Sequence, residues 1–263
     1  MNRRRIYTVA RRQWWSSKRA PFRIFDVALW PVLDILLWGS MGVALSRAGT
    51  PGASPVALLL TGIMMFNIFF QWQIGITTGF LEESTWSRNL LNVLVSPVTD
   101  AEYVAGVALF TLAKAAAALC TVTLTSLVLF GFGIGRLGWE LIPLAFSLTL
   151  AGGALGIFVI GVVLRFGQSA EILVWGFNYV VQVVSGVFFP ISALPGVFRW
   201  LGRITPTSYA FSSLRDLVTT GHAPVSGMVI SLVGSVVALV AASIYSVAMM
   251  RQFRRRGYIT RFS

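Results

Sequence analysis

Six apolar runs, each long enough to cross the hydrocarbon core of a bilayer, constrain the fold of this chain more than any other feature. A membrane-spanning helix needs about 17 to 25 predominantly apolar residues. The runs are Val27 to Ser46, Val56 to Thr77, Val104 to Phe130, Leu141 to Leu164, Ile172 to Phe189 and Val225 to Met250. Of the 263 residues, 56% are hydrophobic and only 11% are charged, about half the charged fraction of a soluble domain. We therefore predict an all-α membrane protein with six transmembrane helices.

The formal net charge of +12 is concentrated at the two ends of the chain. The cations that flank the first and last runs are Arg3, Arg4, Arg5, Arg11, Arg12, Lys18, Arg19, Arg23, Arg251, Arg254, Arg255, Arg256 and Arg261. Six spans place both termini on one side of the membrane, and the excess of cations indicates that this side is the cytoplasm. We predict a multi-pass protein of the cell membrane with a basic cytoplasmic tail over residues 251–263. Nucleic acid is not an expected partner, because no platform of basic and aromatic residues accompanies the charge.

Residues 1–26 have the pattern of an amphipathic helix. At 100° per residue, one face gathers Ile6, Tyr7, Ala10, Trp14 and Ser17, while most of the cations fall elsewhere. Such a helix lies in the inner membrane interface, with its apolar side in acyl chains and its cations near anionic headgroups. A disordered basic tail is the alternative. We treat residues 27–250 as one membrane domain, because the chain has no internal repeat or linker.

A charged, tryptophan-bearing stretch separates the second and third apolar runs. From Trp86 to Ser96 the apolar and polar residues fall on opposite helical faces, and Pro97 ends the pattern. A helix of about 12 residues rises about 18 Å, which is too short to cross the bilayer. We predict a cytoplasmic surface helix over residues 84–97, which a partner can push so that both adjoining spans move. An amphipathic connector without a partner is the alternative.

Two short helical patterns follow the fifth run, at Leu194 to Arg203 and at Thr205 to Val218. Backbone broken at Pro190, Pro195 and Pro206 is tolerated at membrane depth only where protein or water satisfies the freed polar groups. We therefore expect a re-entrant extracellular hairpin over residues 190–222 that caps a cavity or its exit. An interfacial aromatic anchor is the alternative.

A few polar residues interrupt the predicted spans. Asp34 and Lys114 lie at depths that differ by about 5 Å, so an ion pair between them is feasible, and an unpaired charge there costs several kcal/mol. Contact with cargo and snorkelling to the interface are the alternatives. The uncharged polar residues are Asn67, Gln71, Gln73, Asn178 and Gln182. Hydrogen bonds between helices explain most residues of this kind, and a place on a cargo path is the alternative.

The chain carries no recognisable catalytic or metal motif. His222 is the only histidine and Cys120 the only cysteine, which excludes an H-E-x-x-H zinc site and disulfides within the chain. The phosphate-cradling pattern G-x-x-x-x-G-K-[ST] is absent, so any ATP would be hydrolysed by another chain. An intramembrane enzyme and a channel are remote alternatives, since His222 has no evident partner and no selectivity filter is recognisable.

Two stretches resemble the type-2 ABC-transporter permeases, an exporter family with members for drugs, O-antigen and teichoic acid. The first, LLNVLVSPVTDAEYVAG at residues 90–106, is similar to the coupling helix of that family. The second, FFPISALPGVFRWLGRITPTSYAFSSLRDLV at residues 188–218, resembles the segment that follows the family's fifth span, with a Pro-x-x-Tyr-x-x-x-x-x-Arg helix. The spans and both motifs fall in the family's order.

The resemblance implies a permease subunit of an ATP-driven exporter for a hydrophobic drug or lipid-like cargo, with a lipid-linked polysaccharide as the alternative. It implies two kinds of partner, an ATPase subunit that holds ATP and Mg and a second permease chain, identical or related. By resemblance, the ATPase-coupling residues are Glu82, Glu83, Trp86, Arg88, Leu90, Asn92 and Leu94. By the same argument, the extracellular gate residues are Phe188, Phe189, Pro190, Pro195, Pro206 and Tyr209.

Overall fold

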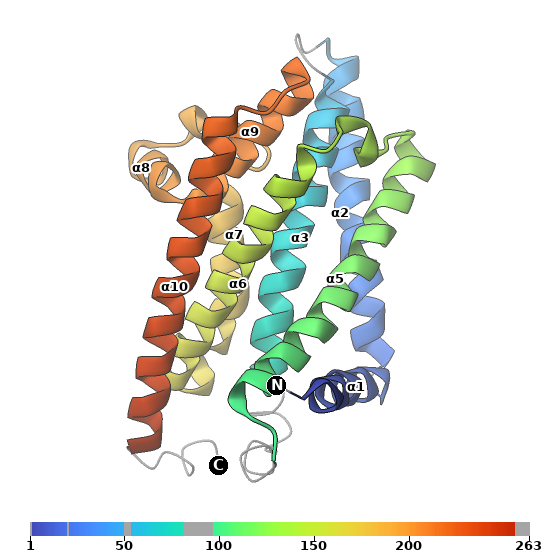
Figure 1. The fold of residues 1–263 in the computed structure, drawn as a ribbon. Coiled ribbons are helices and arrows are strands. Elements are labelled where there is room, and N and C mark those ends of the chain that lie inside the picture. The colour runs from blue at the N-terminus through green and yellow to red at the C-terminus, as the bar shows by residue number, and fades with distance from the viewer. Residues whose placement is uncertain (1, 20, 50–53, 82–96, 256–263) are drawn as a thin grey trace.

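All regular structure in the computed structural model is helical over the residues that it describes, which are 2–19, 21–49, 54–81 and 97–255 (Figure 1). Within these ranges, five helices are long and apolar enough to cross a membrane. They are α2 (Pro21–Arg47), α3 (Pro55–Leu81), α5 (Asp100–Phe130), α6 (Leu141–Phe166) and α10 (Val225–Arg255). The prediction of an all-helical membrane protein is confirmed, and these helices lie close to five of the six predicted runs.

The remaining predicted span forms a shorter helix than expected. Helix α7 (Leu173–Val184) follows a 3₁₀ helix, η3 (Gln168–Ile172). It ends at Ser185, and Gly186 turns the chain with a φ of 66°, a conformation that glycine adopts at little cost. The predicted end of this span at Phe189 is therefore wrong, and α7 is not among the five helices long enough to span.

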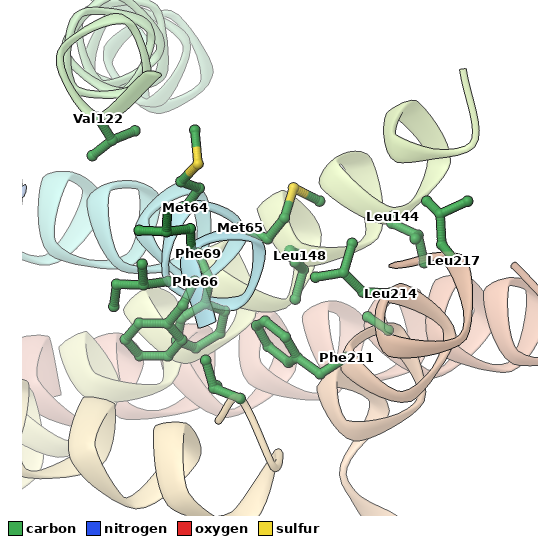
Figure 2. Close-up of a cluster of buried hydrophobic side chains, with 14 of the residues drawn as sticks. Met64, Met65, Phe66, Phe69, Val122, Leu144, Leu148, Phe211, Leu214 and Leu217 are labelled. Atoms are coloured by element: carbon green, nitrogen blue, oxygen red, sulfur yellow. The ribbon is translucent and has the colours of Figure 1, made fainter. Parts of the chain in front are cut away.

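Helix α3 lies at the centre of the bundle and contacts α2, α5, α6, α7 and α9 (Pro206–Thr220). Figure 2 shows apolar side chains of α3 meeting those of three neighbouring helices. The labelled residues are Met64, Met65, Phe66 and Phe69 from α3, Val122 from α5, Leu144 and Leu148 from α6, and Phe211, Leu214 and Leu217 from α9. Since all of them are buried, α9 belongs to the core rather than to a surface loop.

Helices α3 and α6 approach closely because α6 presents glycines to α3. A Cβ on Gly152 would lie 2.5 Å from the carbonyl oxygen of Phe69, and one on Gly156 would lie 3.0 Å from that of Gln73. The two glycines have the G-x-x-x-G spacing that lets helix backbones meet in membranes. On another side of α6, Ser147 and Ser231 of α10 share a buried hydroxyl hydrogen bond. The two contacts fix α6 between α3 and α10.

The N-terminal segment forms a separate helix, α1 (Arg3–Arg19), which lies across the bundle beside the start of α5 (Figure 1). A Cβ on Gly106 of α5 would meet the side chain of Val9 at 2.5 Å, so α1 packs directly on α5. Tyr7 and Trp14 are exposed. The predicted helix is therefore present, while its position in the membrane interface stays a prediction.

Several short helices gather at the opposite end of the bundle from α1 (Figure 1). They are η2 (Ile134–Leu137), η4 (Ile191–Ala193) and α8 (Gly196–Ile204), and α9 joins them. We call the two ends of the bundle the α1 end and the α9 end. Many large apolar side chains on α2, α5 and α10 are exposed, as expected of faces that meet lipid or another membrane chain.

Candidate functional site

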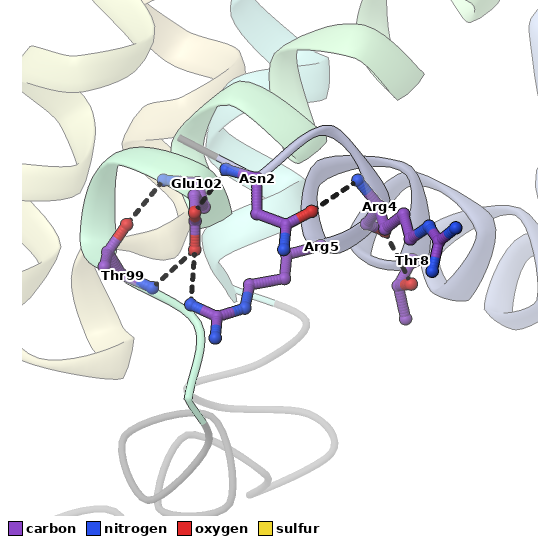
Figure 3. Close-up of polar contacts among 6 residues, drawn as sticks. All are labelled: Asn2, Arg4, Arg5, Thr8, Thr99 and Glu102. Carbon is purple, nitrogen blue, oxygen red and sulfur yellow. Dashed lines mark hydrogen bonds and ion pairs between the residues drawn. The ribbon is translucent and has the colours of Figure 1, made fainter.

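The carboxylate of Glu102, in the first turn of α5, joins the start of α5 to the start of α1 (Figure 3). The backbone amide of Asn2 donates to its Oε1 at 2.7 Å. Its Oε2 accepts from the backbone amide of Thr99 at 3.2 Å and lies 3.5 Å from Nη1 of Arg5. The side chain of Arg5 is 41% exposed and that of Glu102 only 4%. Because water screens the ion pair, the two backbone bonds contribute more to this joint.

Glu102 also forms the N-terminal cap of α5. The hydroxyl oxygen of Thr99 accepts from the backbone amide of Glu102 at 3.3 Å, while the carboxylate of Glu102 accepts from the amide of Thr99. This reciprocal arrangement is a capping box, which fixes where a helix begins. One carboxylate therefore holds both the first turn of α5 and the N-terminus of α1.

The predicted ATPase-coupling residues lie outside the residues that the structure describes. They are Glu82, Glu83, Trp86, Arg88, Leu90, Asn92 and Leu94. Their two flanks are described, and the hydroxyl of Tyr103 in α5 donates to the carbonyl oxygen of Gly79 in α3 at 3.4 Å. The end of α3 and the start of α5 are thus in contact at the α1 end (Figure 1). The coupling role of the segment between them stays a prediction.

A buried polar contact joins α3 to α7. Nδ2 of Asn178 donates to Oε1 of Gln73 and also to the carbonyl oxygen of Val174 at 3.1 Å. Nε2 of Gln73 in turn donates to the hydroxyl of Thr77 at 3.3 Å. Asn178 therefore makes a hydrogen bond between two helices. Among the other predicted polar residues, Asn67 and Gln71 are buried on α3 and Gln182 is half-buried on α7, and a place on a cargo path stays a prediction for them.

Asp34 and Lys114 are both half-buried, on helices α2 and α5 that pack against each other. Elsewhere among the described residues, Arg5 forms an ion pair with Glu102, and Nδ1 of His222 lies 3.5 Å from Oε1 of Glu140. An ion pair between Asp34 and Lys114 stays a prediction.

Aromatic side chains pack together at the α9 end, where we predicted the extracellular gate. Phe188 stacks on Trp38 of α2 with ring centroids 3.4 Å apart, and Phe211 of α9 lies 6.4 Å from Phe66 of α3. Phe189, next in the chain, is half-buried. The segment after α7 is thus held against α2, while α9 is held against α3.

The three predicted prolines each stand at the start of a helical element. Pro190 precedes η4, Pro195 precedes α8, and Pro206 is the first residue of α9, where a missing N–H costs nothing. Thr205 occupies the N-cap position of α9, but its hydroxyl donates to the carbonyl oxygen of Leu201 at 2.7 Å. The side chain of Thr205 therefore does not cap α9.

Two further contacts tie α9 to its surroundings. The hydroxyl of Tyr209 donates to the carbonyl oxygen of Arg203 at the end of α8, at 2.8 Å. Nη2 of Arg215 donates to the carbonyl oxygen of Gly186, also at 2.8 Å, which joins α9 to the turn that ends α7. Burial lowers the pKa of the Arg215 guanidinium, and the charge of neighbouring Asp216 acts in the opposite direction.

Glu102 and Arg215 have structural roles that the sequence-based prediction of the site did not include. The Thr-x-x-Glu pattern from Thr99 to Glu102 is a sequence signature of a capping box, so the local role of Glu102 was open to prediction. Arg215 is a cation on a helix with an apolar stripe, within the predicted re-entrant hairpin. A cation in such an apolar segment is itself a signal of a specific partner.

Five described helices that are long and apolar enough to span, a polar joint at one end and a group of packed aromatic side chains at the other are typical of a multi-pass helical membrane protein. The family model described as ABC-2 type transporter matches residues 4–219. Since the match covers well over half of the 263 residues, the chain belongs to the ABC-2 type transporter family. The matched segment runs from α1 to the last turn of α9, and the match confirms the family resemblance. A comparison with curated proteins found no match.

Proposed function

We propose that this chain is the transmembrane permease subunit of an ATP-driven exporter, with ATP hydrolysed on a separate subunit. Family membership supports a role in transport. The observation that carries the mechanism is the joint at Glu102, which stands directly after the predicted coupling helix at 84–97 and bonds α5 to α1. A displacement of the coupling helix would therefore move α5 and, through the Glu102 carboxylate, α1.

The route begins at the two flanks of the coupling helix. Closure of the ATPase subunits on ATP and Mg presses the coupling helix, which displaces the end of α3 and the start of α5 together, since Tyr103 and Gly79 are bonded. Glu102 passes the displacement of α5 to α1. Because α3 is the central helix of the bundle, its tilt alters the packing of α9 at the other end. The ATPase thereby shifts the balance between inward-open and outward-open states.

The ATPase partner also determines how many permease chains are needed. Two ATPase subunits sandwich ATP in exporters of this family, and each permease chain offers one coupling helix. A second copy of this chain or a related permease therefore completes the assembly. The exposed apolar faces of α2, α5 and α10 provide surface for such a partner as well as for lipid.

The cations of α1 support a cytoplasmic location of the α1 end in the cell membrane. Both termini then lie inside only if the chain crosses six times, so α7 must complete a crossing. Helix α7 rises about 18 Å over its length, and the preceding turns of η3 add about 10 Å, which together approach the roughly 30 Å of hydrocarbon. We assign η3 and α7 as the remaining span.

The cargo is a hydrophobic drug or a lipid-like molecule that leaves near the α9 end. The aromatic pairs Trp38–Phe188 and Phe66–Phe211 support this assignment, because their rings offer apolar contacts to such a cargo.

Uncoupling variants test the proposed function. The complex of this chain with its ATPase is reconstituted in vesicles, and ATP hydrolysis is measured together with export of a hydrophobic dye. Trp86→Ala and Leu94→Glu are expected to reduce dye export per ATP about tenfold or more. Val128→Ala, on an exposed face of α5 at the α9 end, is the matched control. Full coupled export in both coupling-helix variants would remove the proposed lever.

A further inference from the structure

A cavity of about 200 Å³ lies at the α9 end, between the start of α3, the turn after α7 and one face of α9. Its wall is largely apolar, with Leu58 from α3 and Phe211 and Leu214 from α9. One water molecule needs only about 15 Å³ by this kind of measure. The cavity therefore has room for a chemical group of several heavy atoms.

Thr61 of α3 brings a hydroxyl to this wall. The residue is 0% exposed, and its Oγ1 has no hydrogen-bond partner within the part of the chain that the structure describes. A helical threonine commonly satisfies its hydroxyl on the carbonyl one turn earlier, as Thr77 and Thr78 do on this same helix at 2.9 and 2.7 Å. Buried polar atoms are rarely left without a hydrogen-bond partner. The Thr61 hydroxyl therefore indicates that a polar atom of a ligand binds in the cavity.

Arg215 of α9 lines the same cavity. The described contacts of its guanidinium consist of the bond from Nη2 to the carbonyl oxygen of Gly186, whereas a guanidinium has five N–H donors. The neighbouring carboxylate of Asp216 does not line the cavity. A cation in an apolar wall is stabilised by an anion that reaches it, and the fork of arginine matches a phosphoryl or carboxylate group.

We propose that this cavity binds the phosphoryl group of an amphiphile. Arg215 is the charge partner, Thr61 is a second hydrogen-bond donor, and the apolar wall contacts the carbon atoms next to the phosphate. A phospholipid headgroup and a free phosphate share this chemistry, and the experiment distinguishes them. The inference does not depend on the proposed function, because binding requires neither ATP nor an ATPase subunit.

Binding to the purified full-length chain in detergent tests the inference. The probes are phosphatidylglycerol, a diacylglycerol with the same acyl chains but no phosphate, and inorganic phosphate, each titrated and counted by native mass spectrometry. Thr61→Val keeps the shape of the side chain and breaks no described hydrogen bond, so it is expected to fold normally and to weaken phosphatidylglycerol binding about three- to tenfold. Arg215→Gln is expected to weaken it about tenfold or more. Arg203→Gln, an exposed cation on α8, is the control and should bind as the wild type does.

Competition by inorganic phosphate and the binding of the two lipids decide between the remaining possibilities. Competition by inorganic phosphate at similar concentration assigns the site to free phosphate, and its failure to compete assigns the site to the lipid headgroup. Wild-type affinity in Thr61→Val, or equal binding of diacylglycerol and phosphatidylglycerol, overturns the proposal. If Arg215→Gln only lowers the thermal stability while Thr61→Val binds normally, Arg215 serves the Gly186 contact alone, and the proposal is again overturned.

Discussion

The backbone amide of Asn2 donates to the carboxylate of Glu102 across 2.7 Å, although the two residues are 100 positions apart in the chain. This bond places the N-terminus of α1 on the first turn of α5 (Figure 3). Because the contact is made by the carboxylate of Glu102, a change of this side chain removes the bond between the two helix ends together with half of the capping box of α5.

Glu102→Ala is expected to release α1 from α5. The variant removes the acceptor for the amides of Asn2 and Thr99, so amide hydrogen exchange over residues 2–12 should rise several-fold, as expected for a helix end that opens locally. Thr8→Ala is the control, because the exposed hydroxyl of Thr8 bonds within its own helix, to Arg4. Exchange in Glu102→Ala that matches the wild type would show that other contacts hold α1 in place.

The buried pair Gln73 and Asn178 is expected to stabilise the contact of α3 with α7. In a double-mutant cycle with leucine at both positions, the coupling free energy should be about 0.6 to 1.7 kcal/mol, the range for hydrogen bonds between membrane helices. Unfolding in detergent measures it. Gln182→Leu, at a half-buried position of α7 with no described hydrogen bond, should change the stability by less than about 0.5 kcal/mol. A coupling energy of zero would contradict the assignment.

Two glycine-to-alanine variants separate close packing from helix propensity. Gly152→Ala places a Cβ 2.5 Å from the carbonyl oxygen of Phe69, so the free energy of unfolding should fall by about 1 to 3 kcal/mol. Gly176→Ala on α7 meets nothing within 4 Å and should be neutral or stabilise by up to about 1 kcal/mol. Equal effects of the two variants would mean that α3 and α6 do not pack through this glycine.

Thiol labelling tests the assignment of the α9 end to the outside. In a Cys120→Ser background, an impermeant maleimide should label Thr219→Cys in intact cells and Ser169→Cys only after permeabilisation, since both positions are exposed at opposite ends of the chain's bundle. The reverse pattern of labelling would invert the topology and place the predicted coupling helix outside.

Hydropathy predicted, within a few residues, the five described helices that are long enough to span a membrane, because a bilayer demands about 20 apolar residues per crossing. It failed at α7, since the residues after Val184 remain apolar while the backbone leaves the helix at Ser185 and Gly186. A glycine is common in membrane helices, so composition alone does not reveal that this one adopts a left-handed conformation.

The site was predictable where the signal is local and not where it depends on distant contacts. Pro190, Pro195 and Pro206 each mark the start of an element, as the sequence indicates. The capping role of Glu102 is likewise visible in the Thr-x-x-Glu pattern. The hydrogen bond between Glu102 and Asn2 is not visible in the sequence, because this bond depends on how α1 packs across α5.

Export by the reconstituted complex tests the central claim most directly. The purified chain is placed in vesicles with and without its ATPase subunit, and movement of a hydrophobic dye and of a fluorescent phospholipid is measured with and without ATP and Mg. We predict movement only when both the ATPase subunit and ATP with Mg are present, and no ATP hydrolysis by this chain alone. Equal movement in vesicles that lack the ATPase subunit would contradict the account.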